Sequence, residues 1–202
     1  MATKAKASRR SSKDSPDATE LLVLELQEIH NAENQLARVL PRLAKAVQSQ
    51  KLGELLELRL QRGERLIKEI ESVFDEMEES PGRKKNVAAE GLINDAREHV
   101  QEIERGPALD AVLIGAIQKT EHYCIAAWGT ARALAKAVDQ KTAGRAMESA
   151  LKEGPAFDEE LTELAEREIT PALLSGEADG EESESSGSPR PQSRRSEQHA
   201  GR

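Results

Sequence analysis

Two glutamates lie where a helical protein normally places apolar side chains, and they are the residues best able to do chemistry. Glu121 interrupts the most apolar stretch of the chain, from Leu109 to Val138, and Glu33 interrupts a similar stripe nearer the N-terminus. Burying an unpaired carboxylate costs roughly several kcal/mol. Each glutamate must therefore be compensated by a metal ion, an arginine or a proton.

A metal ion held by carboxylates inside a helical bundle is the first of these possibilities. A ferritin-like di-metal centre takes a Glu from each of two helices and a Glu-x-x-His pair from each of two others. None of the histidines has a glutamate three positions before it: His30, His99, His122 and His199. The carboxylates that remain predict at most a weak site for a hard metal ion. They are Glu33, Glu121, Glu153 and Asp158.

A plainer interpretation of the same residues is structural. A glutamate on a long helix usually faces solvent, and a shift of one position in the assumed helical register would move Glu33 or Glu121 outward. Cys124 is then a small buried apolar residue, and Trp128 a packing residue.

The composition favours helices over strands and excludes several classes of protein. The chain has 202 residues, of which 33% are charged and only 2% aromatic, too few aromatics for a β-sandwich or barrel. The formal net charge of -8 argues against a general nucleic-acid-binding protein. The single cysteine, Cys124, excludes an intramolecular disulfide and a cysteine-based zinc site.

Membrane and secreted proteins are also disfavoured. No apolar run approaches the roughly 18 residues of a membrane-spanning helix, and no apolar segment follows the basic N-terminus. We therefore expect a cytoplasmic protein that makes no contact with membranes. Residues 1–16 are expected to form a disordered basic tail, the one part that could contact nucleic acid, and residues 171–202 a disordered polar tail.

Hydrophobic periodicity predicts four long helices and one short helix over residues 17–170. We expect them at about residues 19–47, 52–78, 87–104, 109–138 and 142–168. Thr19 is the predicted N-cap of the first helix, without a capping box. Pro41 and Pro155 are expected to kink or divide their helices, and Pro171 to follow the last one. Short loops between these helices predict an all-α, up-and-down four-helix bundle with one extra short helix.

Each predicted helix has an inward-facing stripe at three- and four-residue spacing. Arg59 and Gly63 interrupt the stripe of the second helix, and one possibility is that the charged end of Arg59 extends to solvent. The stripe of the central helix reads Leu113, Ile117, Glu121, Cys124, Trp128, Ala131 and Ala135.

Three segments within about residues 18–168 carry a resemblance to a known family. LELQEIHNAENQL resembles the opening of the YciE/YciF family of bacterial ferritin-like stress proteins. NVAAEGLI is similar to its glutamate-glycine-leucine element, and LIGAIQKTEHYCIAAWGTARALA matches a third segment. The matching residues are Ala32, Glu33, Gln35 and Leu36, then Glu90, Gly91 and Leu92, then Gln118, Lys119, Glu121, His122, Tyr123, Ile125 and Gly129.

The resemblance implies a ferritin-like bundle, usually dimeric, linked to osmotic and oxidative stress, with no established reaction. It also implies a di-iron site built from the first, second, central and last helices. The matching positions of that site are Glu33, Glu121, Glu153 and Asp158. The chain departs at the others, because Arg59 stands where the family typically has His, Arg62 where it has Glu, and Cys124 replaces a Glu.

These departures fall on positions that would face a metal, and they lead to our main hypothesis. Arg59, with Arg62, replaces the metal by pairing with Glu33 and Glu121, since arginine is always charged and its planar fork suits carboxylates. The chain is then a non-catalytic, stress-associated homodimer without a cofactor.

Two other hypotheses stay open. In one, the carboxylates still hold iron or manganese and support ferroxidase- or peroxide-related redox activity. It differs from the main hypothesis in whether Arg59 points inward. In the other, the chain is an adaptor whose tails bind partners.

Overall fold

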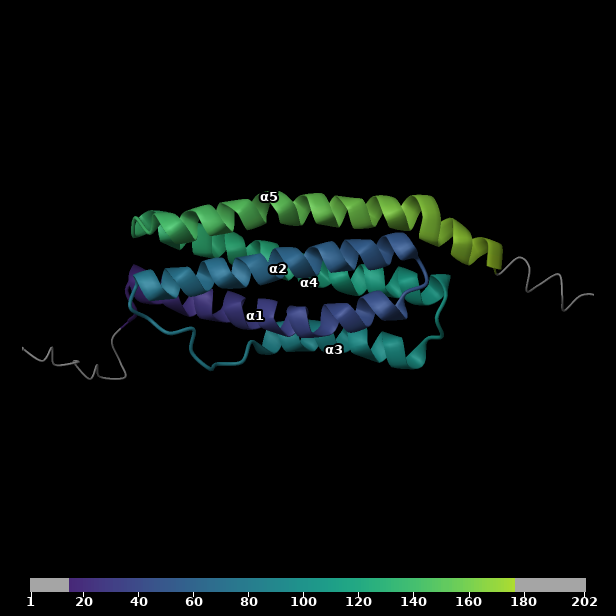
Figure 1. The fold of residues 1–202 in the computed structure, drawn as a ribbon, viewed down its shortest axis with the longest axis horizontal. Helices are drawn as coiled ribbons and strands as arrows, with labels where there is room; N and C mark the ends of the chain where they lie inside the picture. The colour runs from purple at the N-terminus through teal and green to yellow at the C-terminus, as the bar shows by residue number, and fades with distance from the viewer. Residues whose placement is uncertain (1–14, 177–202) are drawn as a thin grey trace, which may run out of the picture.

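The computed structural model describes residues 15–176, and that part of the chain is mostly helical (Figure 1). It contains α1 (Ala18–Ala46), α2 (Gln50–Glu76), α3 (Val87–Glu102), α4 (Pro107–Ala137) and α5 (Lys141–Leu164), which continues into a π-helical turn, η1 (Ala165–Ile169). No strand occurs within residues 15–176. The two tails predicted to be disordered lie for the most part in residues 1–14 and 177–202, outside the described residues.

Helices α1, α2, α4 and α5 form a four-helix bundle, in which α1 and α5 each pack against α2 and α4. Helix α3 lies outside this bundle and packs against α1 and α4. Figure 1 shows that successive helices run in opposite directions through all five helices. Helix α3 connects α2 to α4 by running back along the outside of the bundle, so the second and third bundle helices, α2 and α4, are parallel. The predicted all-α bundle of four long helices with one extra short helix is confirmed. None of the helices in the described part is long and apolar enough to cross a membrane.

The core lies where the helical stripes predict it. The inward positions of α1 and α4 are buried, and these include both glutamates, since Glu33 is 1% exposed and Glu121 is 2% exposed. Arg59 of α2 is 3% exposed. The possibility that its charged end extends to solvent is therefore wrong.

Side-chain caps set the starts of α1 and α3. Asp17, not Thr19, is the N-cap of α1: its carboxylate accepts from the backbone N–H groups of Thr19 and Glu20, while Glu20 accepts from the Asp17 N–H at 3.0 Å. A capping box is therefore present, contrary to the prediction. Val87, the first residue of α3, is 73% exposed, and the buried Asn86 before it caps the helix.

The prolines inside α1 and α5, Pro41 and Pro155, do not produce the predicted division of either helix. Both are exposed, and buried residues on either side keep each helix packed across the missing hydrogen bond. The predicted end of the last helix near Glu168 is too early, because residues 170–176 are helical. Pro171, predicted to follow the last helix, lies within this helical continuation, directly after η1.

A buried carboxylate joins the start of α4 to the turn between α1 and α2. Asp110 is 1% exposed and accepts hydrogen bonds from the backbone N–H groups of Gln48 and Ser49, both at 2.8 Å. The Ser49 hydroxyl in turn accepts from the N–H of Leu52 and caps α2. The sequence did not reveal this contact, since an acidic residue in a first helical turn is commonly explained by the helix dipole alone.

Asp110→Ala should destabilise the fold by about 2–4 kcal/mol, because it leaves two partly buried N–H groups without their acceptor. Asp110→Asn, which keeps one carbonyl acceptor, should cost less. Urea unfolding followed by circular dichroism measures both changes. Glu98→Ala removes an exposed carboxylate from α3 and is the matched control, which should leave the midpoint unchanged. An unchanged midpoint for Asp110→Ala would contradict the prediction.

Candidate functional site

Arg59 lies inside the bundle between two carboxylates from neighbouring helices. Its Nη1 and Nη2 atoms each donate to one oxygen of Glu33, both at 3.0 Å. Its Nε atom donates to Oε2 of Glu121 at 2.6 Å. The side chains of Arg59, Glu33 and Glu121 are 4%, 0% and 3% exposed. Together these three residues are termed the buried triad.

Three helices supply the buried triad, each from its inward stripe. Glu33 comes from α1, Arg59 from α2 and Glu121 from α4. Trp128, two turns after Glu121, places its ring centre 5.6 Å from Cζ of Arg59, which is a cation–π distance. Cys124, one turn after Glu121, is buried as predicted.

Two glycines make room for this arrangement. A Cβ atom on Gly63 would lie 2.8 Å from Oε2 of Glu33 and 3.0 Å from Nη1 of Arg59. A Cβ atom on Gly154 of α5 would lie 2.7 Å from the ring of Trp128. Carbon atoms do not approach other heavy atoms so closely without displacing them. The helices therefore reach the buried triad only because these two positions lack a side chain.

Burial and mutual attraction oppose each other in the buried triad. Burial raises the pKa of Glu121, and Arg59 lowers it again only in part. Burial lowers the pKa of Arg59, but Glu33 and Glu121 together outweigh it and hold that pKa above its ordinary range. Burial also raises the pKa of the Cys124 thiol, so Cys124 is neutral at physiological pH and is no thiolate nucleophile.

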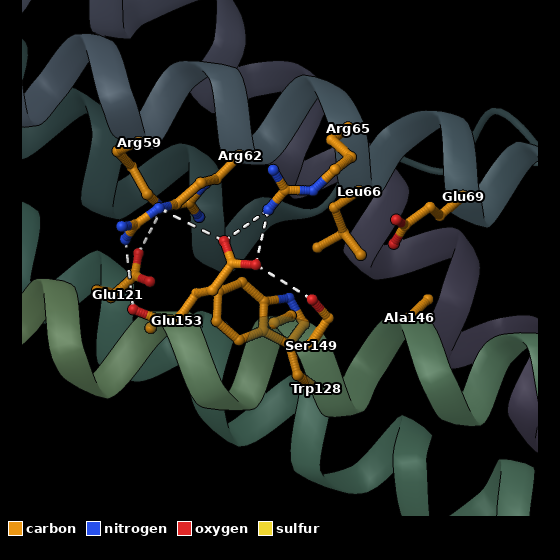
Figure 2. A pocket seen from close by; sticks show the side chains of 12 residues that line it. Arg59, Arg62, Arg65, Leu66, Glu69, Glu121, Trp128, Ala146, Ser149 and Glu153 are labelled. Carbon is orange, nitrogen blue, oxygen red and sulfur yellow. Dashed lines mark hydrogen bonds and ion pairs between the residues drawn. The ribbon is translucent and has the colours of Figure 1, made fainter.

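A second group of ion pairs lies beside the buried triad. Figure 2 shows Arg62 and Arg65 of α2 facing Glu153 of α5. Nη2 of Arg65 lies 2.6 Å from Oε2 of Glu153, and Nε of Arg62 lies 3.4 Å from the same oxygen. The Ser149 hydroxyl donates to Glu153 at 3.1 Å. Residues of both groups line a small cavity. The volume within it that the centre of a water molecule can occupy is about 20 Å³, which is enough for about one water.

Of the four carboxylates predicted as metal ligands, Glu33 and Glu121 lie together in the core, and the other two lie elsewhere. Those on α1 and α4 share the guanidinium of the buried triad. Glu153 lies outside the triad with the two outer arginines, and Asp158 pairs with the exposed His122 at 3.3 Å. Arg62, predicted to pair within the core, is 21% exposed and pairs with Glu153 instead of a triad carboxylate.

The donor set of the buried triad does not fit a di-metal centre. Within residues 15–176, no three His, Cys, Asp or Glu side chains are placed to hold one metal ion. The guanidinium of Arg59 lies between the two carboxylates, and its N–H groups occupy three of their oxygens. A guanidinium has a fixed charge and no open coordination position, so this arrangement offers neither a Lewis acid nor a redox centre.

Comparison with known proteins gives the family. The model described as "Domain of unknown function (DUF892)" matches residues 17–174. The chain belongs to the DUF892 family. Protein YciF of Escherichia coli strain K12 is 38% identical to it over 141 residues, which cover 69% of this chain and 85% of YciF. The resemblance to the YciE/YciF family is confirmed.

Two solved structures share the fold of this DUF892 protein. The crystal structure of the E. coli stress protein YciF has a TM-score of 0.73 and 34% identity, covering 77% of this chain and 99% of that one. The structure of YcfI from Rhodopseudomonas palustris has a TM-score of 0.70 and 29% identity, covering 76% and 98%. The ferritin-like fold predicted from the sequence is thereby confirmed.

Two parts of the site escaped the sequence reasoning. Arg65 follows Arg62 by three residues, as Arg62 follows Arg59, and this spacing signals a row of arginines on α2. The fit of Gly154 against Trp128 has no such signal, because a glycine before a proline is read as a helix break.

Arg59→Ala should destabilise this DUF892 protein by roughly 3–5 kcal/mol at neutral pH, because it leaves two buried carboxylates without their cation. Burial already raises the pKa of Glu121, and the loss of Arg59 raises it further. A carboxyl group whose pKa is raised on folding contributes stability below its unfolded pKa and loses it as the pH rises through the folded one. The cost of Arg59→Ala should therefore be smallest near about pH 4 and grow toward neutrality.

Urea unfolding at both pH values measures this cost. Arg65→Ala is the control, since its side chain is 51% exposed and its loss should cost less than about 1 kcal/mol. Arg59→Met keeps most of the volume and separates the lost charge from a cavity. A cost at neutral pH no larger than that of Arg65→Ala, or a cost that does not fall toward pH 4, would contradict the prediction.

Gly63→Ala should destabilise the fold by about 1–3 kcal/mol, because the added methyl group displaces Glu33 and Arg59. Alanine otherwise favours a helix over glycine by about 1 kcal/mol. Gly91→Ala in α3 meets no atom within 4 Å and is the matched control, which should stabilise the fold. Thermal unfolding of the two variants measures the contrast, and a stabilised Gly63→Ala would contradict it.

Proposed function

We propose that this DUF892 protein is a non-catalytic, stress-associated bundle protein in which Arg59 replaces a metal ion between Glu33 and Glu121. One observation carries the proposal: three of the four carboxylate oxygens accept N–H groups of Arg59. A metal ion between the carboxylates would require this guanidinium to leave a place where its side chain is only 4% exposed.

Arginine can compensate buried carboxylates as a metal ion would, but without the chemistry of a metal. It stays charged throughout the physiological pH range, and the two carboxylates hold the pKa of Arg59 above its ordinary value. Its donors lie in one plane, so they fix the positions of the carboxylates that they bind. These properties support a structural role for the buried triad.

The stress association rests on the family. E. coli YciF is described as a stress protein, and we extend that description to this chain. The homodimer and the cytoplasmic location predicted from the sequence belong to the same proposal.

The proposal is tested by the metal content of the protein, purified after expression with added iron and manganese. Elemental mass spectrometry should find far less than one metal ion per chain in a protein that is helical and unfolds cooperatively. About two iron or manganese ions per chain, as in a di-metal carboxylate bundle, would overturn the proposal and favour redox activity.

A double substitution tests whether metal binding can be restored. Arg59→His with Cys124→Glu removes the cation and adds two side chains of the kinds that hold metal in ferritin-like bundles. Metal content should rise in the double variant and stay low in Cys124→Glu alone, where Arg59 remains. Circular dichroism checks that each variant is helical. A metal content as high in the unchanged protein as in the double variant would contradict the replacement of metal by Arg59.

A further inference from the structure

A groove on the outer face of α1 is lined mainly by cations, although the chain as a whole is acidic. Its wall comes from α1, from the loop between α2 and α3, and from α3, which lie side by side (Figure 1). It is open to solvent and has a volume of about 390 Å³. The four cations are Arg38, Arg83, Lys85 and Arg97, against one carboxylate, Glu90. We refer to it as the basic groove.

Three of the four cations of the basic groove have no anionic partner in the part of the chain that the structure describes. Lys85 pairs with Glu90. Within residues 15–176, neither Arg38 nor Arg83 forms an ion pair, and Arg97 donates only to the amide oxygen of Asn94, at 3.2 Å. Like charges held together without a counterion repel one another, so an anion bound among these guanidinium groups is favoured.

The floor of the basic groove is a fixed network of amide groups. Gln35 donates through Nε2 to Oδ1 of Asn31 at 2.8 Å and to the backbone oxygen of Asn86 at 3.0 Å. The Asn86 N–H donates to the same Asn31 oxygen at 2.9 Å. Asn86 is itself 3% exposed and caps α3. The floor therefore keeps its shape before any ligand arrives.

The loop that carries Arg83 and Lys85 is also held in place. Gln27 of α1 donates to the backbone oxygen of Ser80 at 2.7 Å, and Lys84 pairs with Glu28 at 3.3 Å. Because the loop is fixed against α1, a ligand would bear little of the entropic cost of ordering it.

We propose that the basic groove binds a small phosphate-bearing molecule. Planar guanidinium groups recognise phosphate oxygens in pairs. Three of them line this groove, and its one carboxylate, Glu90, is paired with Lys85. The volume lies in the range of small-ligand sites. None of the lining residues is aromatic, so nothing in the groove stacks on the bases of a single-stranded nucleic acid. The net charge of -8 also repels a polynucleotide more than a small anion.

Isothermal titration calorimetry with inorganic pyrophosphate at low ionic strength tests the proposal on the full chain. We expect saturable binding by the unchanged protein. Arg38→Ala and Arg83→Ala should each weaken it by about tenfold or more, the cost of losing a charge-assisted hydrogen bond. Arg38→Lys, which keeps the charge but not the fork, should give an intermediate affinity. Both arginines are exposed, so the variants should fold, and thermal unfolding checks this.

A second groove supplies the matched control. It lies at the turn between α4 and α5 and also has four cations, among them Arg132, but it has two carboxylates, Asp139 and Glu148. Arg132→Ala removes the same charge from this other exposed surface and should leave pyrophosphate binding unchanged.

Three outcomes would overturn the proposal. The first is the absence of saturable pyrophosphate binding by the unchanged protein. The second is equal weakening by Arg132→Ala and Arg38→Ala, which would mean diffuse attraction to the whole surface. The third is tighter binding of a single-stranded oligonucleotide than of pyrophosphate, lost in Arg38→Ala, which would identify the groove as a nucleic-acid site. None of these outcomes depends on the metal content of the buried triad.

Discussion

One guanidinium shared by two buried carboxylates constrains the whole bundle. The buried triad joins α1, α2 and α4. Helix α5 packs beside the triad because Gly154 leaves room for the ring of Trp128. A shift of α1, α2 or α4 by one residue along its axis would leave a buried charge unpaired, at a cost of roughly 3–5 kcal/mol. An apolar stripe has no comparable penalty, since one aliphatic contact replaces another. We infer that the buried triad sets the register of these helices.

The energetics of the buried triad agree with that role better than with a gain in stability. Burying ionised groups costs desolvation energy that their hydrogen bonds only roughly balance. Burial still raises the pKa of Glu121, although Arg59 donates to it at 2.6 Å. The stability of the bundle must therefore come from its apolar core, in which Leu26, Leu56 and Leu113, for example, are fully buried.

The sequence predicts the parts of this protein that depend on periodicity. The stripes of α1, α2 and α4 follow from helical spacing, and the same spacing places Glu33, Arg59 and Glu121 on inward faces. What periodicity cannot predict is the contact of residues far apart in the chain, such as Asp110 with the turn before α2, or Gly154 with Trp128. The helices across Pro41 and Pro155 belong to this second group, because their continuity depends on packing by neighbouring helices and not on local propensity.

The arginines of α2 and those of the basic groove differ in whether a carboxylate of the same chain already binds them. Arg59, Arg62 and Arg65 each pair with a carboxylate of the same chain, so an incoming anion would first have to displace that partner. Arg38 and Arg83 line one groove, and no carboxylate pairs with them within residues 15–176. An anion binding there replaces only water and relieves the repulsion between the cations. The donors of Arg59 are therefore taken by carboxylates of the same chain, whereas those of Arg38 and Arg83 are left for the anion that we propose.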